Sequence, residues 1–316
     1  MLGVWLKSLT QDHLDVRMRV GKGIETRIVE RPGIWMEDRD IEALREDLKR
    51  VASASLSGED LTYGIFSADR SRLKDSIVTI VYSRKEQVPI AFNALAVMNL
   101  SLNGRPQEVV HLGLVMVDPG QRSQGLSWVL YGLTCLLIFI RNQLRPFWIS
   151  NVTQVPAVIG LVTQNFSNVY PAPQAQDRRS FAHVLLARQI MRGHRHVFGV
   201  GEDAGFEEDR FVITNAYTGG SDGLKKSFEE AAGHRDESYN AFCRDMLDYE
   251  RGDDLLQLGQ MDLNAARKYL TESVPRESLR HLLLSAGLIG LQGLILPLIY
   301  WLDSSRQWGG LRPWGR

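Results

Sequence analysis

The chain has 316 residues, of which 44% are hydrophobic and 23% are charged, so it can bury a substantial core and is not intrinsically disordered. Basic and acidic residues both number 37, and this balance gives no global reason to expect a nucleic-acid partner. The two cysteines, Cys135 and Cys243, stand in no metal-binding or redox spacing, so we expect neither a metal site nor a disulfide framework.

The first half of the chain is predicted to form one helix and three strands. The N-terminal segment 1–23 has an apolar run too short for a secretory signal. An amphipathic pattern with an aspartate cap predicts a helix over 38–54. Apolar runs bounded by turn residues predict strands at 75–83, 88–104 and 108–117. Only short polar turns separate these strands, so we expect them to pair antiparallel.

After the third strand the pattern alternates between helix and strand. A helix is predicted over 121–144, a strand over 146–153 and a second helix over 155–167. A strand–helix–strand sequence of this kind favours a parallel pair with a crossover helix. A basic helix at 180–196 and a strand at 211–217 follow. We therefore predict a mixed α/β domain.

The domain is expected to cover 24–217 and to be followed by a helical extension over 218–280, a hydrophobic segment over 281–303 and a tail over 304–316. Residues 282–302 contain no charge, and a helix of these 21 residues would be roughly 31 Å long, about one hydrocarbon thickness. Arginines flank both ends, and tyrosine and tryptophan lie near the second end. The pattern favours a membrane span or a deep interfacial helix; a buried core or dimer helix is the alternative.

The turn between the third strand and the long helix carries the strongest chemical signal. Residues 117–127 read VDPGQRSQGLS, so an apolar strand ends in a Pro-Gly turn and a helix begins after Gly125. Helix N-termini present unpaired amides, glycine permits close approach of a ligand, and Arg122 can add a charge-assisted bond. These features suit a phosphate group; an ordinary strand–helix turn is the alternative.

This turn resembles motif A of the GNAT acyltransferase superfamily, with Arg122, Gly125 and Ser127 at the three pattern positions. Ser127 replaces the usual glycine or alanine, and Ser123 replaces a common glycine. The order of predicted elements also resembles that family over more than half of the chain. The resemblance implies a mixed, mostly antiparallel sheet, splayed at the motif strand and flanked by helices.

The resemblance also implies a coenzyme A thioester as co-substrate. The amides of the turn would bind its pyrophosphate, the strand end would pair with the pantetheine arm, and an asparagine on the next strand would contact the cofactor. The corresponding residues are Arg122, Ser123, Gln124, Gly125, Leu126 and Ser127 in the turn, Met116 and Val117 in the strand, and Asn151.

For catalysis the family often uses a base on the motif strand, about eleven residues before the motif arginine, where this chain has His111. Histidine titrates near neutral pH and can accept a proton from an attacking amine. Glu108 is a weaker candidate, and a water relay or a histidine without a role are alternatives. The helix 155–167 lacks the tyrosine that the family often uses as a general acid, so Tyr170 is the nearest candidate.

Three features point to a lipid: the C-terminal apolar segment, the apolar strand and helix around the turn, and basic residues concentrated in 178–196. We predict a membrane-associated N-acyltransferase with its catalytic domain facing the cytoplasm. It would move an acyl group, expected to be fatty, from a CoA or acyl-carrier-protein thioester to an amine of an amino acid or aminolipid. In outline it resembles the long-chain N-acyl amino acid synthases. Acetyl transfer to a small molecule or protein, or an inactive acyl-CoA sensor, are the alternatives.

Overall fold

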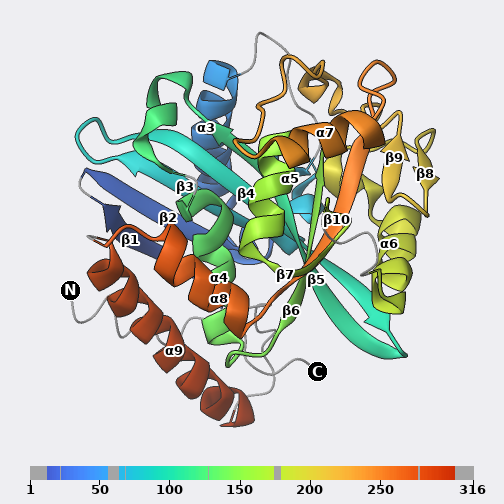
Figure 1. The fold of residues 1–316 in the computed structure, drawn as a ribbon. Helices are drawn as coiled ribbons and strands as arrows, with labels where there is room; N and C mark the ends of the chain where they lie inside the picture. The colour runs from blue at the N-terminus through green and yellow to red at the C-terminus, as the bar shows by residue number, and fades with distance from the viewer. Residues whose placement is uncertain are drawn as a thin grey trace.

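The computed structural model describes residues 13–21, 23–55, 64–67, 69–126, 128–173, 179–276 and 278–302. A ten-stranded sheet runs through the molecule, with helices on both sides (Figure 1). The strands lie in the order β1-β2-β3-β4-β5-β6-β10-β9-β8, and β7 pairs with β10 beside this path. The chain is therefore of mixed α/β class.

The first five strands form an antiparallel meander, which confirms the antiparallel pairing predicted for three of them. Asn103 and Gly104 take positive φ angles in the tight turn between the fourth and fifth strands. The first two strands were not predicted. The five are β1 (Asp15–Gly21), β2 (Ile24–Glu30), β3 (Ser76–Ser83), β4 (Val88–Leu102) and β5 (Arg105–Val117).

The next strand, β6 (Phe147–Thr153), pairs parallel with β5, as the crossover pattern predicted. The connection contains a 3-10 turn η3 (Pro119–Gln124), a π-helical turn η4 (Val129–Leu133) and helix α4 (Thr134–Arg141). This connection packs against one face of the sheet in the largest apolar cluster.

The segment 218–280, which was predicted to be a helical extension, also contains a strand. It contains α7 (Glu237–Met246) and α8 (Leu263–Lys268), but also the strand β10 (Asp254–Met261). This strand lies inside the sheet, antiparallel to β6 on one side and to β9 on the other. Its side chains are buried almost throughout, as expected for an interior strand covered on both faces.

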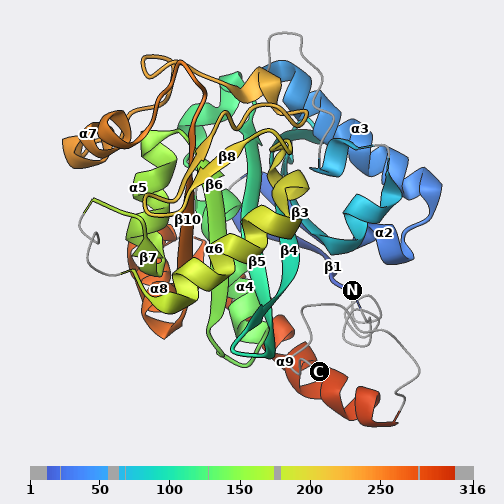
Figure 2. The ribbon, with the colours of Figure 1, turned by 90° about the vertical axis from the view of Figure 1, so that its right-hand side faces the viewer.

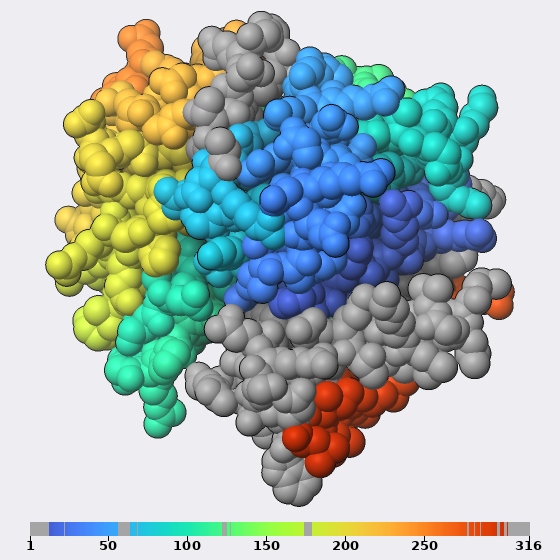
Figure 3. Space-filling view, turned by 180° about the vertical axis from the view of Figure 1, so that it is seen from behind, coloured from blue at the N-terminus to red at the C-terminus, as the bar shows by residue number. Residues whose placement is uncertain are grey.

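The remaining elements cover the two faces and one edge of the sheet. Helices α3 and α6 lie on the face opposite α4, α3 over β3 and β4 and α6 over β4, β6 and β10 (Figure 2). In Figure 3 the N-terminal part of the chain that includes α3, in blue, lies in the upper middle of the visible face. The bounds are α2 (Pro32–Trp35), α3 (Asp38–Ser55), α5 (Pro156–Asn165), β7 (Ser167–Tyr170), α6 (Phe181–Gly193), β8 (Gly205–Glu207) and β9 (Val212–Thr214).

The last helix, α9 (Leu279–Leu302), packs against α4 and β1 at the edge of the molecule (Figure 1). Within the described residues, no helix combines the length and the apolar character that a membrane crossing requires. The span predicted over 282–302 is therefore not confirmed.

Candidate functional site

Strands β5 and β6 part after three residue pairs. The parallel register covers Val109–Trp148, Val110–Ile149 and His111–Ser150, while β5 continues to Val117 and β6 to Thr153. The sheet therefore opens between the second half of β5 and the end of β6.

The opening coincides with a bulge in the β4–β5 pairing at Gly113. The register shifts between Ala94 and Ala96, and Gly113 takes a φ of 36°. A Cβ at this position would lie 1.6 Å from the carbonyl oxygen of Ala94, so only glycine fits. A bulge bends its strand and increases the local twist. The glycine thus lies at the point where β5 turns away from β6.

The opening contains a pocket of about 190 Å³, which we call the splay pocket. Its polar lining comes from several elements: His111, Asn151, Thr153, Gln154, Tyr217, Ser221, Lys226 and Asp254. A second hollow of about 410 Å³, the edge groove, follows Leu114–Val117 of β5 towards the motif turn. The two hollows share five lining residues and are therefore contiguous: Leu114, Val115, Tyr131, Leu224 and Lys226.

Three of the nine residues predicted to bind the donor lie along the edge groove. Met116, Val117 and Leu126 line it. Gly125 adopts the left-handed conformation with a φ of 63° at the end of η3, and it is exposed, with open space where a Cβ would project. At the start of the same turn, Asp118 Oδ1 accepts a hydrogen bond from the Gly120 amide at 2.8 Å.

The other predicted donor-site residues lie elsewhere. The backbone of Arg122, Ser123 and Gln124 forms the 3-10 turn η3. Ser127 falls outside the described residues. Asn151 lines the splay pocket, where its side-chain amide donates to Gln257 Oε1 at 3.2 Å.

A π-helical turn follows the motif and places Tyr131 where the two hollows meet. Such turns leave backbone carbonyls unsatisfied and are frequent at functional sites. Here the buried Asn93 side chain donates to the Leu130 carbonyl at 2.6 Å, and the Tyr269 hydroxyl donates to the Trp128 carbonyl at 2.8 Å. Burial raises the pKa of Tyr131 to about 12, so its hydroxyl keeps its proton at neutral pH.

His111, the predicted base, lines the splay pocket but is only 3% exposed. Its Nδ1 shares a hydrogen bond with Ser150 Oγ at 3.1 Å, and its ring lies 5.3 Å from that of Phe198. Burial lowers the pKa of His111 to about 4, so the imidazole is neutral at physiological pH. A group of this pKa holds a transferred proton weakly.

The sequence did not single out Asp254, the first residue of β10, which also lines the splay pocket. Its carboxyl is 5% exposed and accepts a hydrogen bond from the Tyr217 hydroxyl at 2.8 Å. Burial raises the pKa of Asp254 to about 7; the Tyr217 hydrogen bond opposes this rise, and the charge of Asp253 adds to it. Asp254 forms no ion pair within the described residues. Arg251 pairs with the neighbouring Asp253 instead. A buried carboxyl of this kind can accept a proton near neutral pH.

The predicted acid Tyr170 does not join this group. Its hydroxyl donates to the Asp209 carbonyl at 3.3 Å, and its ring packs against Phe211 in the core beneath α6. The alternative base Glu108 has a side chain that is 51% exposed and pairs with Arg31. Neither residue lines the splay pocket or the edge groove.

The basic segment that was predicted to favour a lipid forms several ion pairs and hydrogen bonds within the protein. Arg188 forms a bidentate ion pair with Glu208. Arg195 donates hydrogen bonds to main-chain carbonyls, which include those of Met191 and Ala204. In the described part of the chain, no group of three or more histidine, cysteine or acidic side chains is arranged to hold a metal ion.

Models of known protein families match no part of the chain, and no curated protein matches it. Among solved structures, a mutant of the BH1408 protein from Bacillus halodurans is similar over 34% of this chain and 69% of its own length, with 13% sequence identity and a TM-score of 0.19. A TM-score this low supports no argument about fold or activity. The function is therefore argued from the geometry of the site.

Proposed function

We propose that the protein is an N-acyltransferase of the GNAT type that uses a coenzyme A thioester as donor. One observation carries this proposal: the edge groove leads from Leu126, next to the glycine turn, into a pocket that contains a buried carboxyl, Asp254, with no ion pair among the described residues. A donor site that opens onto a proton acceptor is what acyl transfer to an amine requires.

The donor would lie along the edge groove. Its pyrophosphate would meet the amides around Gly125, where positive φ and open space permit close approach. Beyond His111, β5 has no pairing to β6, so the β6-facing edge of this stretch can hydrogen-bond the amide groups of a pantetheine arm. Lys226 is exposed at the junction of the two hollows and forms no ion pair within the described residues, so it can attract an anionic donor.

The acceptor would enter the splay pocket as an amine. Its nitrogen attacks the thioester carbonyl, a C–N bond forms and the C–S bond breaks. The Asp254 carboxylate takes the proton that the nitrogen loses, and coenzyme A leaves as a thiolate. Tyr131, protonated and at the junction, can stabilise that thiolate with a hydrogen bond. His111, whose pKa is about 4, is the weaker proton acceptor of the two candidates.

Pocket size bears on the substrates. A volume of about 190 Å³ is below the range of roughly 300–1,000 Å³ typical of larger ligands. This favours a small acceptor, such as an amino acid. It also supports acetyl transfer as a second candidate beside fatty-acyl transfer, because a short acyl group fits where the hollows meet.

The test is release of free thiol from acetyl-CoA and palmitoyl-CoA, with a panel of amino acids and aminolipids as acceptors. We expect release with one donor, lost in Asp254→Asn and retained in Glu108→Gln, a matched change at an exposed carboxylate of the same sheet. Coenzyme A binding without turnover of either donor, or of an acyl carrier protein thioester, would contradict the enzyme proposal and leave a sensor. Equal activity of wild type and Asp254→Asn would remove Asp254 from the mechanism.

A further inference from the structure

Helix α9 presents two different faces. Its inner face is buried against α4 and β1 through Leu282, Leu288, Ile289 and Gln292. Gly293 belongs to this face: a Cβ there would lie 3.3 Å from the carbonyl oxygen of Arg141, so the glycine permits close packing of the two helices. The helix is therefore docked on the body along one side.

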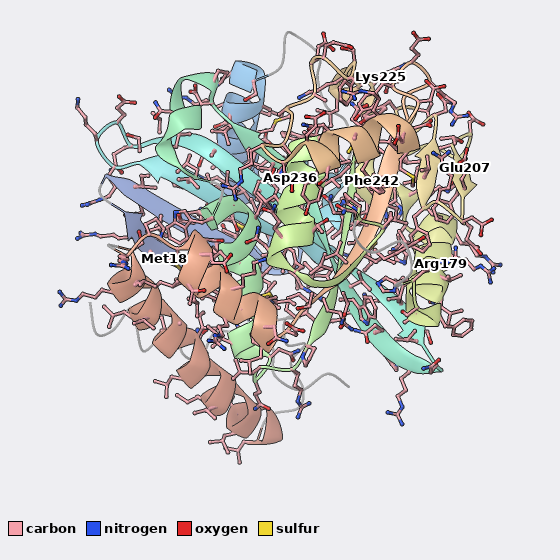
Figure 4. All side chains as sticks on the ribbon, viewed as in Figure 1. Met18, Arg179, Glu207, Lys225, Asp236 and Phe242 are labelled. Carbon is pink, nitrogen blue, oxygen red and sulfur yellow. The ribbon has the colours of Figure 1, made fainter. Side chains whose placement is uncertain are left out.

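The outer face of α9 is a stripe of exposed leucines. Six of the ten large hydrophobic side chains that are exposed in the described part of the chain belong to this helix, with exposures of 45% to 86%. Figure 4 shows side chains of α9 projecting away from the body. At 100° per residue the six fall on one side of the helix. We call them the leucine stripe: Leu283, Leu284, Leu291, Leu294, Leu298 and Leu302.

Exposed leucines scattered singly over a surface would not form a continuous stripe of this length. The helix has 24 residues, which is about 36 Å at 1.5 Å per residue. A contiguous apolar surface on this scale is expected to meet an apolar partner. It runs along one side of a single helix, so it suits a flat surface.

Basic residues occur in α8 and in the sequence that leads into α9. Arg267, Lys268, Arg276 and Arg280 are exposed, and none of the four forms an ion pair among the residues whose placement is described. The segment 263–280 contains only two acidic residues against these four. Beyond α9 the sequence carries three more arginines and two tryptophans. Cations and tryptophan at the ends of an apolar helix suit the headgroup region of a membrane.

We propose that α9 lies in the plane of an anionic membrane surface, with the leucine stripe at the headgroup–acyl boundary and the rest of the protein in water. The inner face stays on α4 and β1, so only the outer face enters the lipid, which is how an in-plane amphipathic helix binds. This inference does not depend on the acyl transfer proposed above.

The charges argue against a second copy of the chain as the partner. A two-fold contact along α9 would set either the same ends or opposite ends of the two helices side by side. Both ends are basic in sequence, so either arrangement places like charges together. Anionic lipid neutralises both ends.

The test is sedimentation of the full chain with sucrose-loaded vesicles. Vesicles of phosphatidylcholine with roughly 30% phosphatidylserine are compared with pure phosphatidylcholine. The triple variant Leu291→Ser/Leu294→Ser/Leu298→Ser removes the middle of the stripe, and Phe181→Ser, at a 70% exposed position on α6, is the matched control. All substituted positions are exposed, and circular dichroism confirms that each variant is folded.

We expect wild type and Phe181→Ser to bind the anionic vesicles and the triple variant to bind at least about tenfold more weakly, with weaker binding of wild type to neutral vesicles. No binding by wild type, or equal binding by the triple variant, would overturn the proposal. A wild-type dimer that the triple substitution converts to monomer, without vesicle binding, would assign the stripe to a second copy instead.

A fluorescent label reports the orientation of the helix. Cys135 and Cys243 are buried, so a thiol label attaches selectively at Leu294→Cys. We expect a label at this position to be quenched by lipids carrying a quencher near the headgroups. Quenching only by groups at the bilayer centre would indicate a span and would contradict an in-plane helix.

Discussion

Replacing Asp254 with asparagine should lower activity and raise stability in the same molecule. The buried carboxyl has a pKa of about 7, against an ordinary value of 3.8. Asparagine resembles its protonated form and can still accept the Tyr217 hydrogen bond, but it cannot take a proton from an amine. The variant therefore separates two properties of the carboxylate: its ability to accept a proton, and the folding free energy that is lost when a charged group is buried.

The sign and size of the stability effect follow from linkage. A carboxyl whose folded pKa is raised contributes stability that is fully present below pH 4 and is lost as the pH rises through 7. The pKa difference of about 3 corresponds to about 4 kcal/mol as an upper limit, because each unit of pKa is worth about 1.4 kcal/mol. At pH 8 the variant should unfold at a higher temperature than wild type, by up to roughly 6 °C, and at pH 4 the two should coincide.

The activity should change in the opposite direction. In wild type the deprotonated fraction of Asp254 rises about tenfold from pH 6 to pH 8, and kcat/KM should rise with it. Loss of the base should lower kcat/KM by about 10² to 10⁴ and leave only the pH dependence of the acceptor amine. The assays are thermal melts at pH 4, 6 and 8 and thiol release over the same range. Unchanged melts together with an unchanged pH profile would refute the assignment of a buried base.

Further substitutions test other parts of the site. Tyr217→Phe removes a hydrogen bond that lowers the pKa of Asp254, so the midpoint of the kcat/KM profile should move to higher pH; an unmoved midpoint would contradict this. Gly113→Ala should destabilise the protein by roughly 3 kcal/mol or more in urea unfolding, because its Cβ would meet a β4 carbonyl, whereas Gly287→Ala, in open space on α9, should change stability by about 1 kcal/mol or less. Tyr131→Phe should lower kcat about tenfold and leave coenzyme A affinity, measured by calorimetry, unchanged; a fall in affinity alone would assign the tyrosine to donor binding.

The parts of the fold that the sequence predicted are those whose signals are local. Strands β3, β4 and β5 are apolar runs joined by short turns, and the β5–β6 crossover follows from strand–helix–strand order. Strand β10 was missed because glutamines and a glycine interrupt its apolar pattern. Its partners also lie far away in sequence, so no local feature indicates its place between β6 and β9.

The residues of the site also fall into two groups: those that a local motif predicts, and those that only the tertiary structure brings together. Met116, Val117 and Leu126 follow from a contiguous motif, and they line one groove. Asp254 and Tyr217 come from distant segments that only the tertiary structure brings to the splay pocket. The raised pKa of the carboxyl is a consequence of burial, which sequence spacing does not reveal.

The register of β6 connects the opening in the sheet to the carboxyl within it. The last β5–β6 pair is His111–Ser150, and the β6–β10 pairing extends beyond it to Thr153, which lies opposite Leu255. Three residues of strand correspond to about 10 Å, so β10 continues past the point where β5 has left the sheet. Asp254 precedes Leu255 at this end of β10, and it lines the same splay pocket as Gly113 and Leu114 of the diverging β5. The bulge at Gly113 marks where β5 diverges, and Asp254 pairs with Ile213 of β9, so the proton acceptor belongs to a paired strand and not to a loop.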